Sequence, residues 1–511
     1  MLASIRPHLG QLVASSSVAR ALRPLSLLCA TVSATVAEPA SLLSQGAPEL
    51  PRGIPQVPAN LATAACTQKV SGSGLQSAVK RAKGGAVLCL DAGERFTGQL
   101  VLPQRGDNGW VVIRTAPASS HPAPGTRIRP SQSSSLAQLA TAGGAPALAS
   151  EPGARGWYLA LLDITIDPDF PKVTSTIVNF VRGSSDLVLD RAFVHAGTEQ
   201  NVQRCVVLNS AATTVINSWL DDCHGKGFDS QAILSWESDG PVLVDNNTLA
   251  GAGENVMLGG ADPKEPGVQP TDFTFTRNHI VTPPEWNRKW SKKNVFETKN
   301  ARRVLIEGNV IEGSWVDGQI GYALVLKTAN QGGRCTWCSS SDVTIRRNFI
   351  RRAAGVFWII GKDRGVVDSL TRRFLITENW AEEIGEGMYG GALQLVSIVQ
   401  GATDFTIERN TLLGGNIKND FMVSPPVRSG IRLVFRRNVL SRGRYSLHGC
   451  GGPIANCLPG AQLSGNVFVG PGGGMLGPGF STAGSLAGAL GGAGVQKSVV
   501  DAATKGVIVT P

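Results

Sequence analysis

The chain has 511 residues, 42% of them hydrophobic and 17% charged, so it is long and apolar enough to bury a large core. Its formal charge is +10, and no run of 18 uninterrupted apolar residues occurs, which argues against a membrane-spanning helix. No nucleic-acid-binding motif accompanies the basic charge. An acidic polymer, such as a uronate-containing or sulfated polysaccharide, is therefore the favoured partner, and plain solubility is the alternative.

Residues 1–37 are typical of an export leader. They contain no Asp or Glu, carry three Arg, and end in an apolar stretch before a small-residue cleavage site at residues 35–37. A Ser- and Arg-rich organelle transit peptide has a similar composition and is the alternative. The leader predicts a secreted, periplasmic or cell-surface protein.

After the leader, composition changes divide the chain into further segments. The expected order is a Pro- and Ala-rich linker (38–66), a coil domain (67–469) containing a low-complexity insertion (116–155), and a Gly-rich tail (470–511). Within the coil domain, residues 73–83 form an amphipathic pattern that predicts a short helix capping the open end of the first coil. Strands are expected at 86–93, 99–103 and 110–115.

A phrase of alternating apolar and polar residues that ends in Asn recurs through the second half of the chain, at steps of 28 to 39 residues. The recurring Asn residues are Asn247, Asn278, Asn309, Asn348, Asn379, Asn410, Asn438 and Asn466. Two degenerate copies precede them, with Ala192 and Trp219 in the Asn position. A fixed period in this range indicates stacked supersecondary units.

The repeat predicts strands rather than helices. Each phrase alternates like Asp404-Phe405-Thr406-Ile407-Glu408, and a second apolar run lies between successive phrases. Helical crossovers do not fit between the runs, which excludes βαβ units. We therefore expect an all-β fold, a right-handed single-stranded parallel β-helix with a short N-terminal capping helix.

The recurring Asn is best explained by structure rather than catalysis. Stacked coils lie about 4.8 Å apart, so identical Asn side chains form a ladder of amide hydrogen bonds. The residues just before each Asn change sign in part from coil to coil, as in Thr377-Glu378 and Arg436-Arg437. That pattern predicts a solvated, self-neutralising edge.

Eight cysteines remain after the leader, and an even count in an exported chain favours disulfides. The local pairs are Cys66–Cys89, Cys205–Cys223 and Cys450–Cys457. Cys335 and Cys338 form a CxxC pattern that suits a redox site, half of a zinc site or a loop-closing disulfide. No second half has the right spacing and no βαβ context is present, so the disulfide is favoured.

The segments LQSAVKRAKGGAVLCLDAGERFTGQLVLP, LNSAATTVINSWL, AGENVMLGGADP and KNVFETKNARRVLIEGNVIEGSW carry a family resemblance. Through these segments, residues 73–440 resemble the secreted right-handed parallel β-helix repeat proteins of the pectin-lyase-like superfamily. Within that superfamily, the resemblance is to a bacterial group. This resemblance implies the architecture. It implies no single activity.

Two catalytic patterns of that superfamily are not matched. Polygalacturonase-like hydrolases carry an Asp-Asp pair, a Gly-His-Gly and an Arg-x-Lys on successive coils, whereas here Asp221-Asp222 and His224-Gly225 share one turn. The Arg-x-Pro-x-x-Arg phrase and the calcium-binding carboxylates of pectate-lyase-like enzymes are not evident. No metal ligand set is therefore predicted, and Ca²⁺ enters only if the protein is a lyase.

Outward side chains of stacked coils lie in rows that form a groove for a linear polymer. Aligning the second strands predicts one row, which contains Asn209, Ser235, Gly259, Glu297 and Lys327. Glu297 and Lys327 then become neighbours, either as an acid/base pair with mutually tuned pKa values or as a cross-coil salt bridge.

A second set of candidates lies on the turns. Asp229, Glu254 and Glu297 are the carboxylates suited to glycoside hydrolysis, and Lys299 or Lys327 is the base of a β-elimination. The amides of Gln231, Asn255 and Asn300 are expected to bind substrate above an open floor of small Gly residues. Roles in stabilising the turns are the alternative for Asp229 and Asn255.

The loop at 282–294 combines Trp286 and Trp290 with Arg288 and three Lys. Aromatic faces stack on sugar rings and cations suit an acidic chain, so the loop is a candidate binding wall. The alternative is a Trp-anchored loop with a solvated basic edge.

Taken together, the residues favour a monomeric exported β-helix protein that binds an acidic polysaccharide in a groove along the solenoid and needs no cofactor; whether it also cleaves that polymer, as a lyase or hydrolase, is left open. The alternative is a non-catalytic carbohydrate-binding or cell-surface β-helix protein.

Overall fold

The computed structural model describes residues 47–511 apart from 142–143, 392–393, 416, 418, 425–431, 450–459 and 475. The expected leader and the expected Cys450–Cys457 pair lie outside the described residues. No helix in the described part of the chain is both long and apolar enough to cross a membrane.

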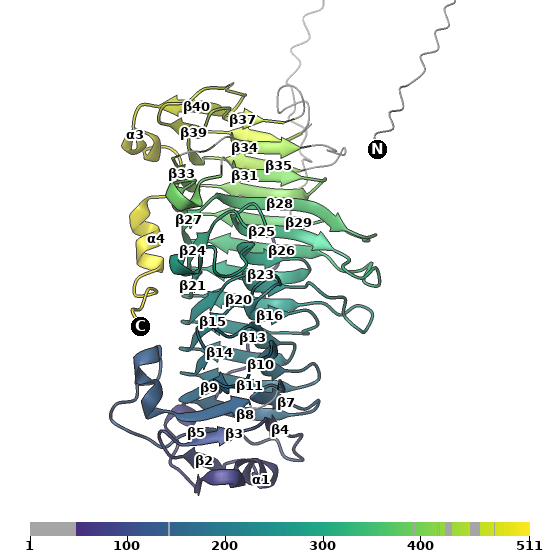
Figure 1. Cartoon of the computed structure of the whole chain (residues 1–511). Coiled ribbons are helices and arrows are strands. Elements are labelled where there is room, and N and C mark those ends of the chain that lie inside the picture. Colours follow the sequence, from purple (N-terminus) through teal and green to yellow (C-terminus); the bar gives the residue numbers. More distant parts are fainter. Residues whose placement is uncertain are drawn as a thin grey trace, which may run out of the picture. The chain divides into compact units, whose positions relative to one another are not determined.

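The described strands form three parallel sheets, and each coil adds one strand to each sheet in turn (Figure 1). Sheet A contains, in order of pairing, β1 (Gln68–Val70), β2 (Val87–Leu90), β5 (Val111–Thr115), β8 (Arg155–Ala160), β11 (Ser185–Asp190), β14 (Ala211–Ile216), β17 (Val242–Asp245), β20 (Thr271–Thr276), β23 (Ala301–Glu307), β26 (Ser340–Arg346), β29 (Arg372–Thr377), β32 (Thr403–Glu408), β35 (Leu433–Arg436) and β38 (Gln462–Ser464). Sheet B contains β3 (Arg95–Thr97), β6 (Ala137–Thr141), β9 (Leu162–Ile166), β12 (Phe193–His195), β15 (Trp219–Cys223), β18 (Thr248–Gly251), β21 (His279–Val281), β24 (Val310–Ser314), β27 (Phe349–Ala353), β30 (Trp380–Ile384), β33 (Thr411–Gly414), β36 (Val439–Ser441), β39 (Asn466–Val469) and β40 (Phe480–Ala483). Sheet C contains β4 (Leu100–Leu102), β7 (Leu148–Ser150), β10 (Thr174–Phe180), β13 (Val202–Leu208), β16 (Gln231–Ser235), β19 (Glu254–Leu258), β22 (Asn294–Thr298), β25 (Tyr322–Ala329), β28 (Gly355–Arg364), β31 (Gln394–Val399), β34 (Asn419–Ser424) and β37 (Leu447–His448).

In-register stacking builds the core. In sheet A the Cα partners run Phe273, Val304, Val343, Phe374 and Phe405, one residue from each of five successive coils, and all five are buried. Such rows remove apolar surface from water, at about 25 cal/mol per Å², without any helix. The fold is therefore a parallel β-helix, as the repeat and the resemblance predicted.

The Asn ladder is confirmed as the structural element at the corner between sheets A and B. The Oδ1 atom of Asn379 accepts hydrogen bonds from the backbone N–H of Asn348 (3.1 Å) and from its Nδ2 (2.9 Å). Asn379 in turn donates in the same way to Asn410 (3.0 and 2.9 Å). The pattern repeats from Asn247 to Asn466, and every member is fully buried. No ladder amide is free for chemistry.

The residue before each ladder position explains why the corner is tight. Arg347, Glu378 and Arg409 adopt φ values of 54°, 56° and 53°, and Gly308 and Gly465 take the same place at 65° and 61°. This left-handed conformation turns the chain sharply and favours Gly. The buried amide bonds of the ladder hold the non-Gly residues there.

One ladder position differs from the sequence prediction. The backbone N–H of Ser218, not of Trp219, donates to Asn247 Oδ1 (2.8 Å), and Ser218 Oγ accepts from the backbone N–H of Ala192 (3.0 Å). Trp219 pairs with Thr248, one residue past the ladder. The assignment of Trp219 was wrong because a short serine hydroxyl can replace the amide.

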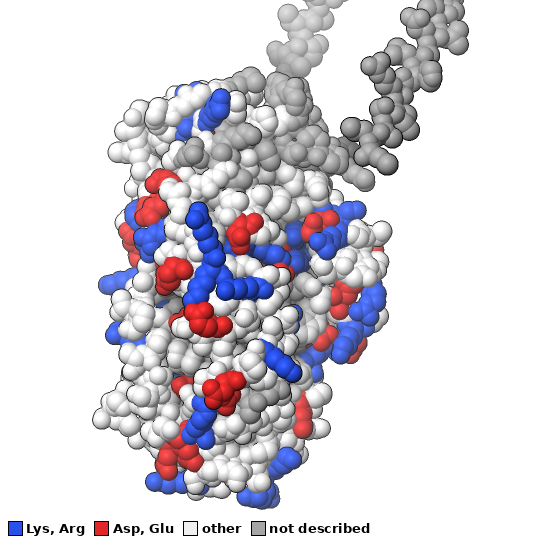
Figure 2. Space-filling model, in the orientation of Figure 1, with Lys and Arg blue, Asp and Glu red and all other residues white. Residues whose placement is uncertain are grey.

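The outer side of the same corner is the self-neutralising edge that the sequence predicted. Glu378 pairs with Arg347 on one side (2.9 Å) and with Arg409 on the other (3.1 Å), and Arg436 pairs with Glu408 (2.6 Å). Figure 2 shows basic and acidic side chains interspersed over this view. Exposed pairs of this kind are worth little individually, so the edge is surface chemistry.

Helices and single turns surround the sheets. They are η1 (Ala59–Thr63), η2 (Gly72–Gly74), α1 (Leu75–Arg81), η3 (Pro130–Ser135), η4 (Pro284–Trp286), η5 (Gly387–Tyr389), α3 (Leu486–Leu490) and α4 (Lys497–Ala503). The predicted helix at 73–83 corresponds to α1, which buries Leu75, Ala78 and Val79 and lies at one end of the stack in Figure 1. The described part of the linker lies against sheet A, where Arg52 pairs with Asp272 (2.5 Å).

Residues 116–155 differ from the expected insertion. They contain β6 and β7, which pair with strands on both sides within sheets B and C. Their Ala- and Ser-rich composition suits positions inside the coil, where Ala137, Ala140 and Ala147 are fully buried. Small side chains packed inside the coil, rather than an insertion outside it, explain the composition.

The tail at 470–511 turns back along sheet B. After β40, helix α4 packs on the outward aromatic row of that sheet, where Val500 lies in one buried cluster with Phe349 and Trp380. Further on, the carbonyl of Val507 accepts from Arg127 Nη1 (2.7 Å), and Val509 packs on the cluster of Phe193 and Trp219. Figure 1 shows α4 beside β21, β24 and β27.

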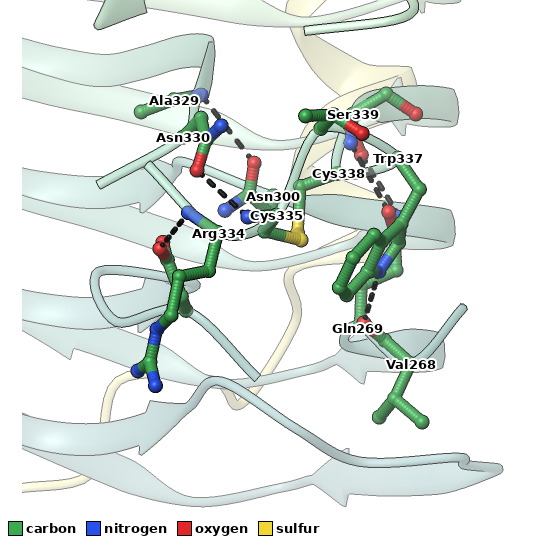
Figure 3. The surroundings of a disulfide bond; sticks show 12 residues. Val268, Gln269, Asn300, Ala329, Asn330, Arg334, Cys335, Trp337, Cys338 and Ser339 are labelled. Atoms are coloured by element: carbon green, nitrogen blue, oxygen red, sulfur yellow. Dashed lines mark hydrogen bonds between the residues drawn. A yellow bond between two sulfur atoms is a disulfide. The ribbon is translucent and has the colours of Figure 1, made fainter. Parts of the chain in front are cut away.

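Three of the expected disulfides are present, Cys66–Cys89, Cys205–Cys223 and Cys335–Cys338. The CxxC pair closes a loop, as predicted (Figure 3). The Asn330 side chain accepts from the backbone N–H of Cys335 (2.8 Å), and the indole of Trp337 donates to the carbonyl of Val268 (2.9 Å). The loop is thereby anchored to an earlier coil.

If the ladder carries the stack, Asn379→Ala should lower the free energy of unfolding by about 3 to 5 kcal/mol, because buried donors on Asn348 lose their acceptor. Asn379→Asp keeps that acceptor but replaces the Nδ2 donor with an oxygen facing the carbonyls of Ile345 and Thr377, so it should cost at least as much. Urea unfolding measures both, and Asn108→Ala, on an exposed side chain, is the control. A wild-type midpoint for Asn379→Ala would contradict the structural role of the ladder.

Candidate functional site

The candidate site lies on the outward side of sheet C, where β16, β19, β22, β25 and β28 follow one another. Inward positions are apolar, as in the row Val256, Phe296 and Leu324. The outward row alternating with it runs through Met257, Glu297 and Val325. Strand alternation thus turns Glu297 away from the core.

The predicted outward row is wrong in register, although its central contact is right. Glu297 pairs with Val325 rather than Lys327, and Ser235 pairs with Leu258 rather than Gly259. Lys327 lies two residues beyond Val325 on the same side of the strand, and its Nζ reaches back to Glu297 Oε1 (2.9 Å). The long lysine side chain spans the register difference.

Glu297 is held as a carboxylate. Lys327 Nζ also contacts Asp363 Oδ2 (2.8 Å), and Lys299 Nζ lies 4.0 Å from Glu297 Oε1. Burial alone would raise the pKa of Glu297, but the charges of Lys299 and Lys327 and a hydrogen bond from Asn294 (3.0 Å) outweigh it. The pKa of Glu297 therefore lies below its ordinary value.

Glu254 has the opposite balance. Its side chain is fully buried, Gln231 Nε2 donates to its Oε2 (2.7 Å), and Lys293 Nζ lies 3.4 Å from its Oε1. Burial and the charges of Glu297 and Asp229 raise its pKa to about 7, against the lowering effect of Lys293 and Lys299. Near neutral pH, Glu254 holds its proton for much of the time.

Asp229 completes the cluster at the surface. It pairs with Lys293, which therefore bridges Asp229 and Glu254. The structure thus brings together all five residues that the sequence proposed for catalysis, which are Asp229, Glu254, Glu297, Lys299 and Lys327. We call these five residues with Gln231, Lys293 and Asp363 the carboxylate–lysine cluster.

Lys292 is a residue that the sequence analysis missed, because it was grouped with the basic edge of the loop at 282–294. It is fully buried, and its Nζ donates to Thr282 Oγ1 (2.7 Å) and to the carbonyl of Asn294 (2.8 Å). Burial lowers its pKa to about 7, although the charge of Glu254 raises it. The available signal was its position, two residues before the buried strand β22, which begins at Asn294.

Two expected amide ligands are turned toward the backbone. Asn255 donates to the carbonyl of Val281 (2.6 Å), and Asn300 Oδ1 accepts from the backbone N–H of Ala329 (3.4 Å). Both are buried, and for Asn255 this matches the turn-stabilising alternative. The expected open Gly floor is filled, since a Cβ at Gly259 would lie 2.7 Å from the backbone nitrogen of Asn300.

The expectation of an exposed aromatic wall is also wrong. Trp286 and Trp290 are only 7% and 3% exposed, because both pack on the imidazole of His224, where Trp290 is stacked at 3.8 Å between ring centroids. Arg288 is exposed on the same loop. Burial of large aromatic surface anchors the loop, as the alternative reading held.

The two glutamates are shielded from solvent, whereas part of the surrounding cluster is exposed. Glu254 and Glu297 have no exposed side-chain surface, whereas Lys293 and Asp229 above them are 25% and 41% exposed. At the other end of the cluster, Asp363 lines a surface pocket of about 600 Å³.

The cluster is suited to proton transfer. Two carboxyl groups on neighbouring strands have pKa values moved in opposite directions, which is the arrangement that separates an acid from a base. The pKa values of Lys293 and Lys327 are raised despite burial, because Glu254 and Glu297 stabilise their charged forms. Protonated lysines are poor bases for β-elimination. Within the described residues, no group of three or more His, Cys, Asp or Glu is placed to hold a metal ion.

Comparisons with known proteins add the following. No protein-family model matches the chain, and no curated protein matches it. Among solved structures, the PL6 family alginate lyase AlyGC is similar with a TM-score of 0.48 and 13% identity, over 88% of this chain and 60% of that chain. A mannuronic acid specific polysaccharide family 6 lyase from human gut microbiota gives 0.44 and 11%, over 86% and 96%.

The catalytic domain of a GH87 α-1,3-glucanase in complex with nigerose gives a TM-score of 0.42 and 12% identity, over 85% of this chain and 69% of that chain. This chain thus spans about 60% of the length of the first lyase.

The buried position of Glu254 predicts a pH-dependent effect on stability. Its folded pKa of about 7 exceeds the ordinary 4.5, so the stability that its neutral form contributes is complete below pH 4.5 and is lost as the pH rises through 7. Glu254→Gln mimics the neutral form. It should unfold like the wild type at pH 4.5 and be more stable at pH 8, by on the order of 1 to 3 kcal/mol. Thermal unfolding of both proteins at both pH values checks this. A stability difference between the variant and the wild type that is the same at pH 4.5 and pH 8 would contradict it.

Proposed function

We propose that this chain is an exported carbohydrate-active β-helix protein that hydrolyses glycosidic bonds of a polysaccharide at the carboxylate–lysine cluster. The observation that carries the proposal is the divergence of the pKa values of Glu254 and Glu297 on neighbouring strands. A raised and a lowered carboxyl pKa at one site are what acid-assisted cleavage of a glycosidic bond requires.

In this reaction, the protonated carboxyl of Glu254 gives its proton to the glycosidic oxygen as the bond from the anomeric carbon to that oxygen breaks. The ionised Glu297 stabilises the positive charge that develops on the sugar ring. Water then supplies the hydroxyl group to the anomeric carbon, and its second proton restores Glu254. Lys299 and Lys327 keep Glu297 ionised throughout.

An acidic polysaccharide is the substrate class that we propose. Lys293 is partly exposed and contacts Glu254, Lys299 lies buried beside Glu297, and the whole chain carries a formal charge of +10. Cations placed above the acid/base pair attract a carboxylate- or sulfate-bearing chain. When the polymer binds the lysines, their contacts with Glu254 and Glu297 weaken and the reacting sugar gains access.

Export is supported by the three disulfides, which persist in oxidising compartments and are rare in the cytosol. The acidic polysaccharides of cell walls and matrices lie in those same compartments. A secreted, periplasmic or cell-surface location therefore fits both the covalent chemistry and the proposed substrate.

A non-catalytic polysaccharide-binding role is the second candidate, and one observation favours it. Glu254 and Glu297 have no exposed surface in this structure, so the lysines can bind an acidic chain while the glutamates only balance their charge. In that case, binding would occur without cleavage.

The proposed hydrolysis is tested on purified protein with a panel of uronate-containing and sulfated polysaccharides, by release of reducing ends and by absorbance at about 235 nm, which detects the unsaturated product of elimination. We expect new reducing ends without that absorbance. Glu254→Gln and Glu297→Gln should each lower the rate at least about 100-fold, and Glu265→Gln, on an exposed loop, should not.

The rate should fall as the pH rises above about 7, because Glu254 must hold its proton. Cleavage that survives in both glutamine variants would contradict the site assignment. Binding without cleavage by the wild-type protein would support the non-catalytic candidate.

A further inference from the structure

A pocket of about 510 Å³ lies on the outward side of sheet B, away from the carboxylate–lysine cluster. Its floor comes from β15, β18 and β21, one wall from the loop at 282–294, and another from the end of the tail. The lining includes Thr198, Asp221, Asp222, His279, Trp286 and Pro511. A volume of this size suits one or two sugar rings.

The charged groups of the pocket are mostly negative. Asp221, Asp222 and Glu285 face it, and the ammonium group of Lys289 is already bound by Glu199 (2.7 Å). An anionic ligand would be repelled here. The pocket therefore selects against the uronates and sulfates that suit the other site.

The two aspartates present different environments. Asp221 accepts from the indole N–H of Trp219 (3.1 Å) and from the backbone N–H of Asp222 (2.8 Å), while Asp222 lies 3.2 Å from His224. Burial and the charge of Asp222 raise the pKa of Asp221 to about 6, although the nearby His195 lowers it. A ligand hydroxyl that donates to Asp221 would favour its ionised form.

The remaining walls are mostly apolar. Val281 and Pro283 line the pocket together with Val509 and Pro511 of the tail, and Trp219 and Trp286 contribute only small exposed parts of their rings. His279 is 8% exposed, and its Nε2 contacts Glu312 (2.6 Å), which holds the imidazole in the wall.

We propose that this pocket binds a sugar residue that carries no negative charge, with ring hydroxyls donating to Asp221 and Asp222 and an apolar ring face lying along the aliphatic wall of Val509 and Pro511. Apolar side chains beside carboxylate acceptors suit the apolar face and the hydroxyl edge of a pyranose. The pocket contains no residue of the carboxylate–lysine cluster, so the assignment does not depend on the proposed hydrolysis.

The loop at 282–294 connects the two regions. Trp286 and Lys289 line the pocket, whereas Lys292 and Lys293 reach the cluster on the other side. A polymer with uncharged and charged sugars could thus contact both at once. The pocket supplies selectivity by repelling negatively charged sugars, whereas the lysines of the carboxylate–lysine cluster attract them.

Isothermal titration calorimetry on the full chain tests the pocket with uncharged oligosaccharides of glucose, galactose, mannose and xylose, and with galacturonic acid trimer. We expect at least one uncharged oligosaccharide to bind, and the trimer not to compete with it. Asp221→Asn should weaken that binding at least about 10-fold, and so should Asp222→Asn, which suits the left-handed φ of 51° at this position.

Glu254→Gln, which alters only the other site, and Glu265→Gln should leave the binding of the uncharged sugar unchanged. The affinity should also rise as the pH rises through about 6, where Asp221 ionises. Circular dichroism verifies that each variant is folded. The proposal is overturned if no uncharged oligosaccharide binds, if the two asparagine variants bind like the wild type, or if the galacturonic acid trimer displaces the uncharged sugar.

Discussion

Buried amide hydrogen bonds between stacked Asn side chains are the interaction on which the rest of the structure depends. From Asn278 onward, the Oδ1 atom of each Asn accepts hydrogen bonds from the backbone N–H and the side-chain amide of the Asn in the previous coil. These bonds hold successive corners directly above one another. That alignment places the strands of the coils between Asn247 and Asn466 opposite their equivalents in the next coil. The core rows, the charged edge and the outward rows that carry chemistry all follow from it.

The fold could be predicted because the sequence repeats an Asn-ending strand pattern at a nearly constant spacing. The distance from Asn348 to Asn379 and the alternation within each phrase are local properties, and they are sufficient to imply stacked parallel coils. The ladder residue near 218 and the strands within 116–155 were predicted wrongly because the repeat is altered in both places. Ser218 replaces the ladder Asn with a shorter side chain, and β6 and β7 consist of small residues that lack the usual apolar signal.

The candidate site could be predicted in part. The sequence brought Glu254, Glu297 and Lys327 together because adjacent coils must meet, and the contact survives an incorrect register because lysine is long. Burial could not be predicted, since it depends on how loops fold over the coils. Trp290 is therefore buried against His224 instead of being exposed for a sugar, and Lys292 is buried instead of lying on the basic edge of the loop. The pocket on sheet B was missed because residues as distant as 198 and 511 line it.

The central claim is that one fold holds two neighbouring carboxyl groups in different protonation states. The most direct measurement is a pH titration followed by NMR of the protein labelled with ¹³C at the glutamate side-chain carboxyl, with signals assigned through Glu254→Gln and Glu297→Gln. The account predicts that the Glu254 signal titrates near pH 7, while the Glu297 signal stays that of a carboxylate from pH 5 to 8. If both signals titrate together in the ordinary range of a glutamate, the account is contradicted.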